Sequence, residues 1–396
     1  MNNNIPSPMR AEYLRHSDKP GYAQGVLTVY AGEDLPCEYR AFWGNANGKL
    51  ESYTALAPII CTGEVTEFEL APYTLIPRGA DRLLVFGATE RGKELSDGYA
   101  EVMLPQGASD YDLGKPMYEM QVQSDIHLSQ NPEHSHNRHF AAVLEDIKKT
   151  SPNTLGLFIN GDITNHGYVT EYDACMEIID STPSAPPVYF AMGNHDLSTY
   201  DDLPCDVATA NFLKGTRNTW SDKAYFDLWI GGVHFIFLAS ERARQRAWLS
   251  PQQLAWLDAK LAENRNTHRA KYVFLHQGMV DTVAGCLAYQ KWHDVEQTAE
   301  LTEVLGKYPE AVLFSGHSHW KLESPHTMKP RDEKLPTIFN TSAGGYTWDD
   351  TSMTTQTGYD ESEGYYFYGY EDKVLALGRD FLNGKWIASA QFIIEY

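Results

Sequence analysis

Five short clusters of polar residues in this chain carry the side-chain types that bind metal ions. Each cluster directly follows an apolar, strand-like run. The clusters are, in chain order, Asp125-Ile126-His127, Gly161-Asp162, Gly193-Asn194-His195-Asp196, His276 and Gly316-His317-Ser318-His319. Carboxylates, an amide and imidazoles, with no thiolate among them, suit transition metals. The set therefore predicts a site for two adjacent metal ions.

The segments before these clusters are expected to be strands that bring the clusters together. Apolar runs precede all five clusters, and helical patterns occur between them, one with Phe140, Val143, Leu144 and Ile147 on a single face and one near 168–180. Ser250-Pro251 is typical of a helix start, with the serine as cap and the proline at the first helical position. Layered α/β sheets place ligand sites in the loops beyond strand ends. We therefore expect the clusters to converge at one edge.

The chain is predicted to have two domains. Residues 1–20 read as a loose N-terminal segment, and 21–108 show short alternating runs with turn residues between them, typical of an all-β sandwich. A hairpin signal lies at Asn45-Ala46-Asn47-Gly48. Turn formers make 109–117 a linker. Residues 118–396 alternate strands and helices, which predicts an α/β (α+β layered) domain built around a mixed sheet.

Composition narrows the classes of partner. The formal charge is −21, which repels phosphate backbones, so no nucleic acid is expected as partner. No run approaches the ~18 apolar residues of a membrane span. The N-terminal stretch lacks the pattern of a secretory signal, and the five scattered cysteines fit reduced thiols. These features favour a cytoplasmic protein, with a secreted mature form as the alternative.

The ordered clusters resemble those of the calcineurin-like metallophosphoesterases, whose pattern is DxH, GDxx, GNH(D/E), H and GHxH. The similarity spans roughly residues 118–320, and the sequence Gly161-Asp162-Ile163-Thr164-Asn165 is most similar to the bacterial phosphodiesterase branch. The resemblance implies a mixed β-sheet sandwich flanked by helices. The first domain loosely resembles a fibronectin type III or immunoglobulin-like module.

The resemblance also implies roles for single residues. Asp125, His127 and His319 would bind one metal, Asn194, His276 and His317 the other, and Asp162 would bridge them. His195 would be catalytic together with Asp162, stabilising the transition state or protonating the leaving alkoxide. The implied activity is that of a dinuclear phosphohydrolase in which a metal-bridging hydroxide attacks a small phosphodiester or phosphomonoester in line. The cofactors would be two divalent or trivalent ions, with Mn, Fe or Zn favoured.

Several interpretations stay open at the level of sequence. Asn165, His166, Trp320 and Tyr346 are candidate substrate contacts, with surface or core filling as the alternative for the aromatic residues and His166. The segment 134–139, rich in histidine, reads either as a lid or as a solvated loop entering a helix. An inert scaffold protein and a nuclease of the same fold are the alternative functions. The natural substrate, the role of the first domain and the oligomeric state are not encoded in any recognisable pattern.

Overall fold

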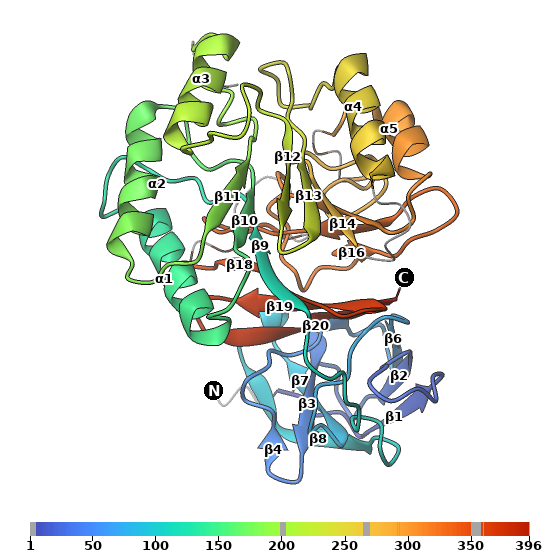
Figure 1. Cartoon of the computed structure of the whole chain (residues 1–396). Coiled ribbons are helices and arrows are strands. Elements are labelled where there is room, and N and C mark those ends of the chain that lie inside the picture. The colour runs from blue at the N-terminus through green and yellow to red at the C-terminus, as the bar shows by residue number, and fades with distance from the viewer. Residues whose placement is uncertain are drawn as a thin grey trace. The chain divides into compact units, whose positions relative to one another are not determined.

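The computed structural model describes residues 5–198, 203–263, 270–290, 292, 294–349, 358 and 360–395. The chain divides into two compact units (Figure 1). Unit 1 contains residues 1–115, 375–378 and 385–394, and unit 2 contains residues 116–374, 379–384 and 395–396. The C-terminal strands β19 (Lys373–Asp380) and β20 (Lys385–Glu395) contribute residues to both units.

Unit 1 is all-β in its N-terminal part. One antiparallel sheet has the order β1-β2-β6, and a second has the order β4-β3-β7-β8, with β5 also paired to β3. The bounds are β1 Arg10–Arg15, β2 Gly25–Tyr30, β3 Glu38–Asn45, β4 Gly48–Lys49, β5 Ile59–Ile60, β6 Val65–Leu70, β7 Arg82–Ala88 and β8 Leu95–Met103, with a 3₁₀ turn at Glu90–Gly92. The predicted hairpin joins β3 to β4 and is confirmed. Trp43 and Tyr39 are fully buried in this core.

The segment expected to be loose at the N-terminus is partly ordered, so this expectation was wrong for residues 10–15. Those residues form β1, which pairs antiparallel with β2. Its side chains alternate between exposed and half-buried, and Ala11 and Tyr13 pack against the core. Three alternations on an edge strand are too weak a periodicity to stand out from polar, Pro-containing flanks. The likeness of this unit to a fibronectin type III module stays a prediction.

The first sheet of unit 2 belongs to a strand order β11-β10-β9-β18-β19-β20, in which β11 to β18 lie wholly in unit 2. Strands β9, β10 and β11 run parallel, and β18 pairs antiparallel with β9. The second sheet has the order β12-β13-β14-β15-β17-β16, parallel from β13 to β17 with antiparallel strands at both edges. The bounds are β9 Tyr118–Gln123, β10 Leu157–Asn160, β11 Val188–Ala191, β12 Phe226–Ile230, β13 Val233–Phe237, β14 Lys271–Phe274, β15 Ala311–Ser315, β16 Met328–Lys329, β17 Thr337–Asn340 and β18 Glu363–Gly369.

The two sheets of unit 2 pack face to face through aromatic side chains. The ring of Phe158 on β10 stacks on Phe235 of β13 with centroids 4.3 Å apart. The hydroxyls of Tyr118 on β9 and Tyr272 on β14 lie 2.8 Å apart, so each buried phenol finds a polar partner. Strands buried on both faces read as continuous apolar runs, which is how they appear in the sequence.

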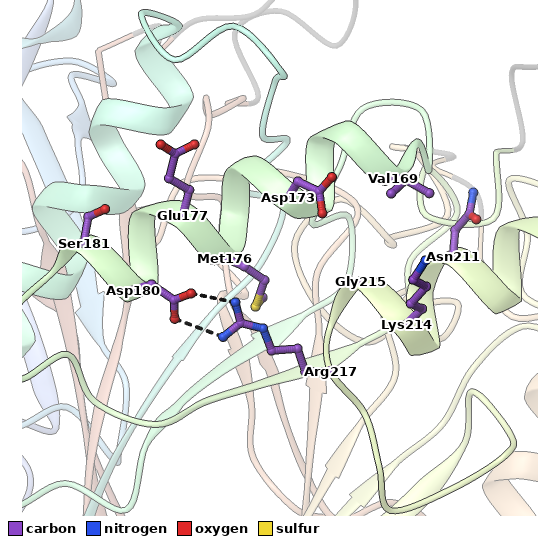
Figure 2. Close-up of a pocket in the computed structure, with 10 residues that line it drawn as sticks. All are labelled: Val169, Asp173, Met176, Glu177, Asp180, Ser181, Asn211, Lys214, Gly215 and Arg217. Carbon is purple, nitrogen blue, oxygen red and sulfur yellow. Dashed lines mark hydrogen bonds and ion pairs between the residues drawn. The ribbon is translucent and has the colours of Figure 1, made fainter.

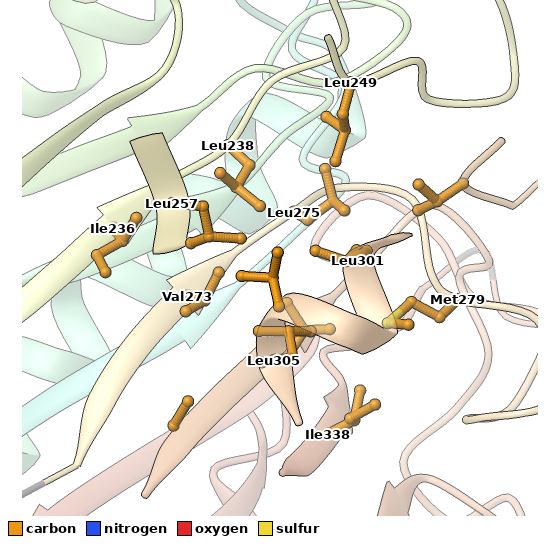
Figure 3. Close-up of a cluster of buried hydrophobic side chains, with 14 of the residues drawn as sticks. Ile236, Leu238, Leu249, Leu257, Val273, Leu275, Met279, Leu301, Leu305 and Ile338 are labelled. Carbon is orange, nitrogen blue, oxygen red and sulfur yellow. The ribbon is translucent and has the colours of Figure 1, made fainter. Parts of the chain in front are cut away.

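Helices cover the outer faces of this sandwich. Those of unit 2 are α1 Ser135–Thr150, α2 Val169–Ser181, α3 Cys205–Gly215, α4 Pro251–Ala262 and α5 Thr298–Leu305. Figure 3 shows α4 and α5 residues such as Leu257 and Leu301 packed on Ile236 and Val273 of the second sheet. The hydroxyl of Ser250 accepts a hydrogen bond from the Gln253 amide at the start of α4, which confirms the predicted cap.

These layers confirm the predicted fold class, a mixed α/β structure with helices beside its sheets and an all-β region before it. The helix with Phe140, Val143, Leu144 and Ile147 on its buried face is α1, as predicted. Among the described residues, no helix is both long and apolar enough to cross a bilayer.

Glu363, at the start of β18, joins two loops, one that follows β15 and one that follows β17. Its buried carboxyl accepts hydrogen bonds from the Leu322 amide, at 2.7 Å, and the Ser342 hydroxyl, at 2.9 Å. Burial, and secondly the charge of Glu361, raise the pKa of Glu363 to about 8. The folded protein therefore holds a proton on this carboxyl that the unfolded chain releases near pH 4.3.

This difference predicts a pH dependence of stability. Between the unfolded and folded pKa values of Glu363 the native state binds more protons, so the free energy of unfolding falls as pH rises. The Glu363→Gln variant should lose this decrease of the free energy of unfolding with pH. Its Tm should therefore be at least about 2 °C above that of the wild type at pH 8.5, but not at pH 5. Circular dichroism melts at both pH values measure it. Glu145→Gln, on the exposed side of α1, is the control, and parallel slopes in the wild type and Glu363→Gln would contradict the prediction.

Candidate metal centre

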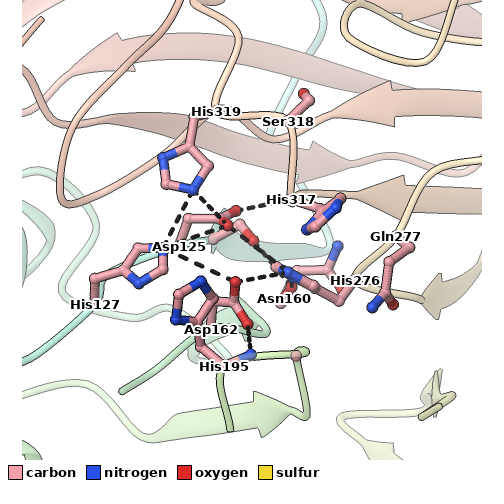
Figure 4. A network of polar contacts seen from close by, with 12 residues as sticks. Asp125, His127, Asn160, Asp162, His195, His276, Gln277, His317, Ser318 and His319 are labelled. Atoms are coloured by element: carbon pink, nitrogen blue, oxygen red, sulfur yellow. Dashed lines mark hydrogen bonds and ion pairs between the residues drawn. The ribbon is translucent and has the colours of Figure 1, made fainter. Parts of the chain in front are cut away.

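The predicted ligand residues lie in loops that follow the carboxyl ends of five strands. Asp125 and His127 follow β9, Asp162 follows β10, His276 follows β14, and the Gly316 cluster follows β15. Asn194 and His195 follow β11. Figure 4 shows Asp125, His127, Asp162, His276, His317 and His319 with their polar atoms turned toward one another. The convergence expected from the sequence is present.

The first group consists of Asp125, His127 and His319. Their ligand atoms all lie within 4.8 Å of one another. His319 Nε2 is 3.0 Å from Asp125 Oδ1 and 3.2 Å from His127 Nε2. All three side chains are buried. Two imidazole nitrogens that face each other beside a carboxylate oxygen are an arrangement that a shared cation would satisfy.

The second group consists of Asp162, His276 and His317, again with ligand atoms within 4.8 Å. His276 Nε2 lies 3.0 Å from Asp162 Oδ2, and the same oxygen is 3.9 Å from His127 Nε2 in the first group. Asp162 Oδ2 therefore lies between the two groups, as a bridging ligand must. Asn194 is fully buried in the neighbouring loop, next to His195.

Backbone carbonyls orient two of these imidazoles. His276 Nδ1 lies 2.8 Å from the carbonyl of Asn160, and His319 Nδ1 lies 2.9 Å from the carbonyl of Tyr346. A carbonyl oxygen only accepts, so each Nδ1 carries a proton and each Nε2 is the ring nitrogen turned toward the carboxylates. This second contact fixes the tautomer and ring orientation that a metal-binding histidine needs.

The ligand loops are held in strained backbone conformations. Asp125, His127, Asp162, His317 and His319 all have positive φ values, between 45° and 65°. Such conformations cost roughly 1–3 kcal/mol each and persist where the surrounding structure enforces them, characteristically at functional sites. Cross-loop hydrogen bonds enforce them here, from the His127 amide to the Asp162 carbonyl and from the His317 amide to Asp125 Oδ2, at 3.0 and 2.9 Å.

Two motif glycines are required by close approach. A Cβ atom on Gly193 would lie 2.1 Å from Asp162 Oδ1. On Gly161, which has a φ of +93°, it would lie 2.6 Å from His276 Nδ1. Any side chain at either position would displace a predicted ligand, so the glycines of both motifs have a steric reason.

Electrostatics at the site favour added positive charge. Burial would raise the pKa of the Asp125 carboxyl, but His319 and His276 outweigh it and hold that pKa well below its usual range. The pKa of Asp162 is lowered in the same way, chiefly by His276. Burial would lower the pKa of His276, yet Asp162 and Asp125 raise it to about 9. One imidazolium thus compensates the two carboxylates when no metal does so.

Two other imidazoles, those of His127 and His317, stay neutral, as metal ligands must. Burial lowers the pKa of His127 to about 4 and that of His317 to about 3. Asp125 Oδ1 and His276 Nε2 are both buried and lack a hydrogen bond of good geometry within the described residues, although His319 Nε2 and Asp162 Oδ2, respectively, lie 3.0 Å from them. Buried polar atoms without partners call for an explanation. A bound cation accounts for both atoms, so the residues present fit the expected metal pair.

His195 lies at the edge of this cluster and is half-buried. Its amide donates to Asp162 Oδ1 at 2.8 Å, and its Nδ1 donates to the carbonyl of Asn165 at 2.7 Å. The ring stands perpendicular to His127 with centroids 4.7 Å apart. The carbonyl bond leaves Nε2 as the atom that can exchange a proton with a substrate.

Asp196 is a positioning residue that the sequence pattern contains but does not explain. Its fully buried carboxylate accepts hydrogen bonds from the amides of Gly193, Ile163 and Thr164 at 2.9–3.2 Å, and from the Tyr172 hydroxyl at 3.1 Å. It therefore holds the loop of Asp162 against the loop of Asn194. Its place in the Gly193 cluster is the only signal that sequence reasoning had.

The predicted substrate contacts occupy different surroundings. The Asn165 side chain donates to the His127 carbonyl at 3.3 Å, and His166 is exposed with its ring on Tyr168. Trp320 is fully buried, whereas Tyr346 is half-buried and lies 4.3 Å from His319, ring to ring. A direct substrate contact stays a prediction for all four residues, and Tyr346 has the position best suited to one.

Two further aromatic side chains lie beside the ligand groups, although the sequence did not single them out as site residues. His136, in the first turn of α1, lies 5.7 Å from Tyr346 between ring centroids, and its Nδ1 is 3.0 Å from the His127 carbonyl. The histidine-rich segment therefore packs beside the first group, closer than a solvated loop would. Trp292 lies 5.8 Å from His317. Only the nearness of His136 to the first cluster could have indicated its position.

A separate groove of about 420 Å³ lies between α2 and α3 (Figure 2). It is lined by Asp173, Glu177 and Lys214, and at one end Arg217 forms a two-point ion pair with Asp180 at 2.6 and 2.9 Å. None of the residues that line it is a predicted ligand. It is a charged surface groove distinct from the candidate metal centre.

Comparison with known proteins agrees with this geometry. A protein from Pseudoalteromonas sp. (strain SM9913), named a probable cyclic nucleotide phosphodiesterase, is 25% identical over 46% of this chain and 61% of its own. The serine/threonine-protein phosphatase CPPED1 of Mus musculus is 26% identical over 45% of this chain and 57% of its own. The chain thus spans about three fifths of the length of these curated relatives.

One solved structure, of vacuolar protein sorting 29 from Cryptosporidium parvum, covers 70% of this chain and 97% of its own with 12% identity and a TM-score of 0.31. That score is too low to bear on fold or function. The family model described as calcineurin-like phosphoesterase matches residues 122–321, half of the chain, and that region contains every ligand loop described above. The protein therefore belongs to the calcineurin-like phosphoesterase family.

Proposed function

We propose that this protein is a phosphohydrolase with a dinuclear metal centre, acting on a small phosphodiester or phosphomonoester. The observation that carries the proposal is the position of Asp162 Oδ2 between two groups of ligand atoms, 3.0 Å from His276 Nε2 and 3.9 Å from His127 Nε2. In this proposal Asp125, His127 and His319 hold one ion, and Asn194, His276 and His317 hold the other, with Asp162 shared.

When bound, such a metal pair supplies a nucleophile from water at neutral pH and offsets charge on phosphoryl oxygens. The chain's own residues provide the rest. The carbonyls of Asn160 and Tyr346 keep His276 and His319 in the ligating tautomer. The hydrogen bonds between the ligand loops keep the donor atoms in place before substrate arrives, which lowers the reorganisation needed during reaction.

His195 is proposed to deliver a proton to the leaving alkoxide. Its Nδ1 donates to the Asn165 carbonyl, so its Nε2 is the atom left to face the substrate. Its amide bond to Asp162 couples its position to that of the proposed bridging ligand. Proton transfer from a positioned histidine is worth ~10²–10⁴-fold in rate.

Two findings bear on the substrate. The net charge of −21 disfavours polynucleotides, which a basic surface would otherwise attract. The relatives are named as a cyclic nucleotide phosphodiesterase and a protein phosphatase, so both diester and monoester chemistry occur among similar proteins. His195 Nδ1 donates to the neutral carbonyl of Asn165, at the position where a carboxylate partner would make the ring more basic. A small phosphoester is therefore the proposed substrate.

The Asp162→Asn variant tests the shared ligand. It keeps the size of the side chain but removes its charge, so we expect at least about a 100-fold loss of metal affinity and of turnover of bis-p-nitrophenyl phosphate with Mn²⁺. Elemental analysis and steady-state kinetics measure the two effects. Asp227→Asn is the control, because Asp227 also pairs with a histidine, His234 at 2.9 Å, but lies outside both ligand groups. Full metal content and turnover in Asp162→Asn would refute the dinuclear proposal.

The His195→Gln variant tests the proton donor separately from metal binding. We expect kcat to fall by about 10²–10⁴-fold while metal content stays at the wild-type level, because the ring is not a proposed ligand. The loss should be smaller for p-nitrophenyl esters, whose leaving group needs little protonation, than for alkyl esters. His16→Gln, on an exposed residue of unit 1, serves as the control. Equal losses for both ester types would exclude the proposed role.

A further inference from the structure

A hollow of about 340 Å³ in unit 2 is lined in part by Trp292, whose ring lies 5.8 Å from that of the proposed ligand His317. Its walls are Val280, Leu287, Trp292 and the pair Arg246–Asp294. Such a volume, lined by apolar residues with a few polar groups, falls in the range of small-molecule sites. The established family features do not involve it, because none of these residues belongs to a ligand cluster.

Trp292 connects the hollow to the metal centre. Its indole lies 5.8 Å from the His317 ring between centroids, nearly perpendicular at 83°. It also lies 5.2 Å from Trp348 and 5.9 Å from Trp320, again edge to face. Three edge-to-face contacts fix the orientation of the ring without enclosing it, since Trp292 stays half-buried. A fixed and accessible indole beside a proposed ligand is a stacking surface.

The remaining walls are also held in place. Gln290 Oε1 accepts hydrogen bonds from the Gly285 and Leu287 amides, at 2.7 and 3.2 Å, which shapes the loop before Trp292. The Arg246 guanidinium lies 2.5 Å from Asp294, and about half of its side chain is exposed. Val280 is 42% exposed, an unusual exposure for a large apolar side chain beside a site. The hollow thus has an apolar wall, an aromatic face and one fixed charged pair.

We propose that this hollow binds a planar aromatic ring carried by the group esterified to the phosphate, with Trp292 as the stacking residue. The inference rests on the proposed phosphohydrolase function, because it places the phosphate at the metal centre and the ring beyond His317. Trp292, Val280 and Leu287 all line the hollow, so a flat ring bound there would meet an indole and two apolar side chains. Stacking of a base on an aromatic side chain is worth ≈ 1–3 kcal/mol by substitution, about 5–150-fold in affinity.

The test compares two ligands that differ only in the ring. Adenosine 5′-monophosphate and ribose 5-phosphate are titrated by calorimetry into the Mn²⁺-loaded full chain, with phenyl phosphate as a third ligand that separates a nucleobase from a simple aryl group. We expect adenosine 5′-monophosphate to bind at least about 10-fold more tightly than ribose 5-phosphate. In Trp292→Leu this ratio should fall to about 1 while the Kd of ribose 5-phosphate stays unchanged, and Trp292→Phe should keep most of it.

Trp229→Leu is the matched control, since Trp229 is 43% exposed on β12 and stacks on His234 away from the ligand clusters. Metal content is measured for each variant, because Trp292 contacts His317. A ratio near 1 in the wild type, an unchanged ratio in Trp292→Leu, or no binding of either ligand overturns the subsite. Turnover of bis-p-nitrophenyl phosphate is measured separately, so that a protein without turnover but with the Trp292-dependent ratio refutes the hydrolytic function and keeps the subsite.

Discussion

The burial of two carboxylates, Asp125 and Asp162, is the constraint on which the rest of unit 2 depends. Two such charges in a low-dielectric interior are tolerated only with compensating positive charge or donors. Imidazoles from four loops surround them, and one imidazole, His276, gains a raised pKa by doing so. Burial keeps His127 and His317 neutral, with lone pairs available. The local electrostatics and the proposed metal pair are thus two aspects of the same arrangement.

Meeting this constraint requires the unusual backbone of the ligand loops. Asp125 and Asp162 reach the centre only with positive φ values, and Gly193 gives Asp162 the space it needs. The carboxylate of Asp196 then binds the amides of adjoining loops, so the strain is distributed over a hydrogen-bonded network. Sheet packing through Phe158 and Phe235 supplies the rigid base on which these loops rest.

Much of this arrangement could be predicted from the sequence because it is encoded locally. The ligand clusters each follow a strand, and parallel strand ends meet at one edge, so their convergence needed no distant information. The Ser250 cap and the apolar face of α1 were readable for the same reason. The position of Trp292 was not, because it depends on how a loop without regular periodicity folds back on His317. The edge strand β1 was missed because its alternation is short and half-exposed.

One contact between the two sheets carries a consequence for stability. His276 comes from the second sheet and Asn160 and Asp162 come from the first, and the Nδ1 bond of His276 to the Asn160 carbonyl closes the gap between them. In the proposed metal centre the ligands come from both layers, so a bound cation would link the two sheets. A free ion concentration of 1,000 times the Kd would raise the free energy of unfolding by about 4 kcal/mol. Removing the ion with a chelator would therefore weaken the contact between the two sheets, and the Tm would depend on the ion concentration.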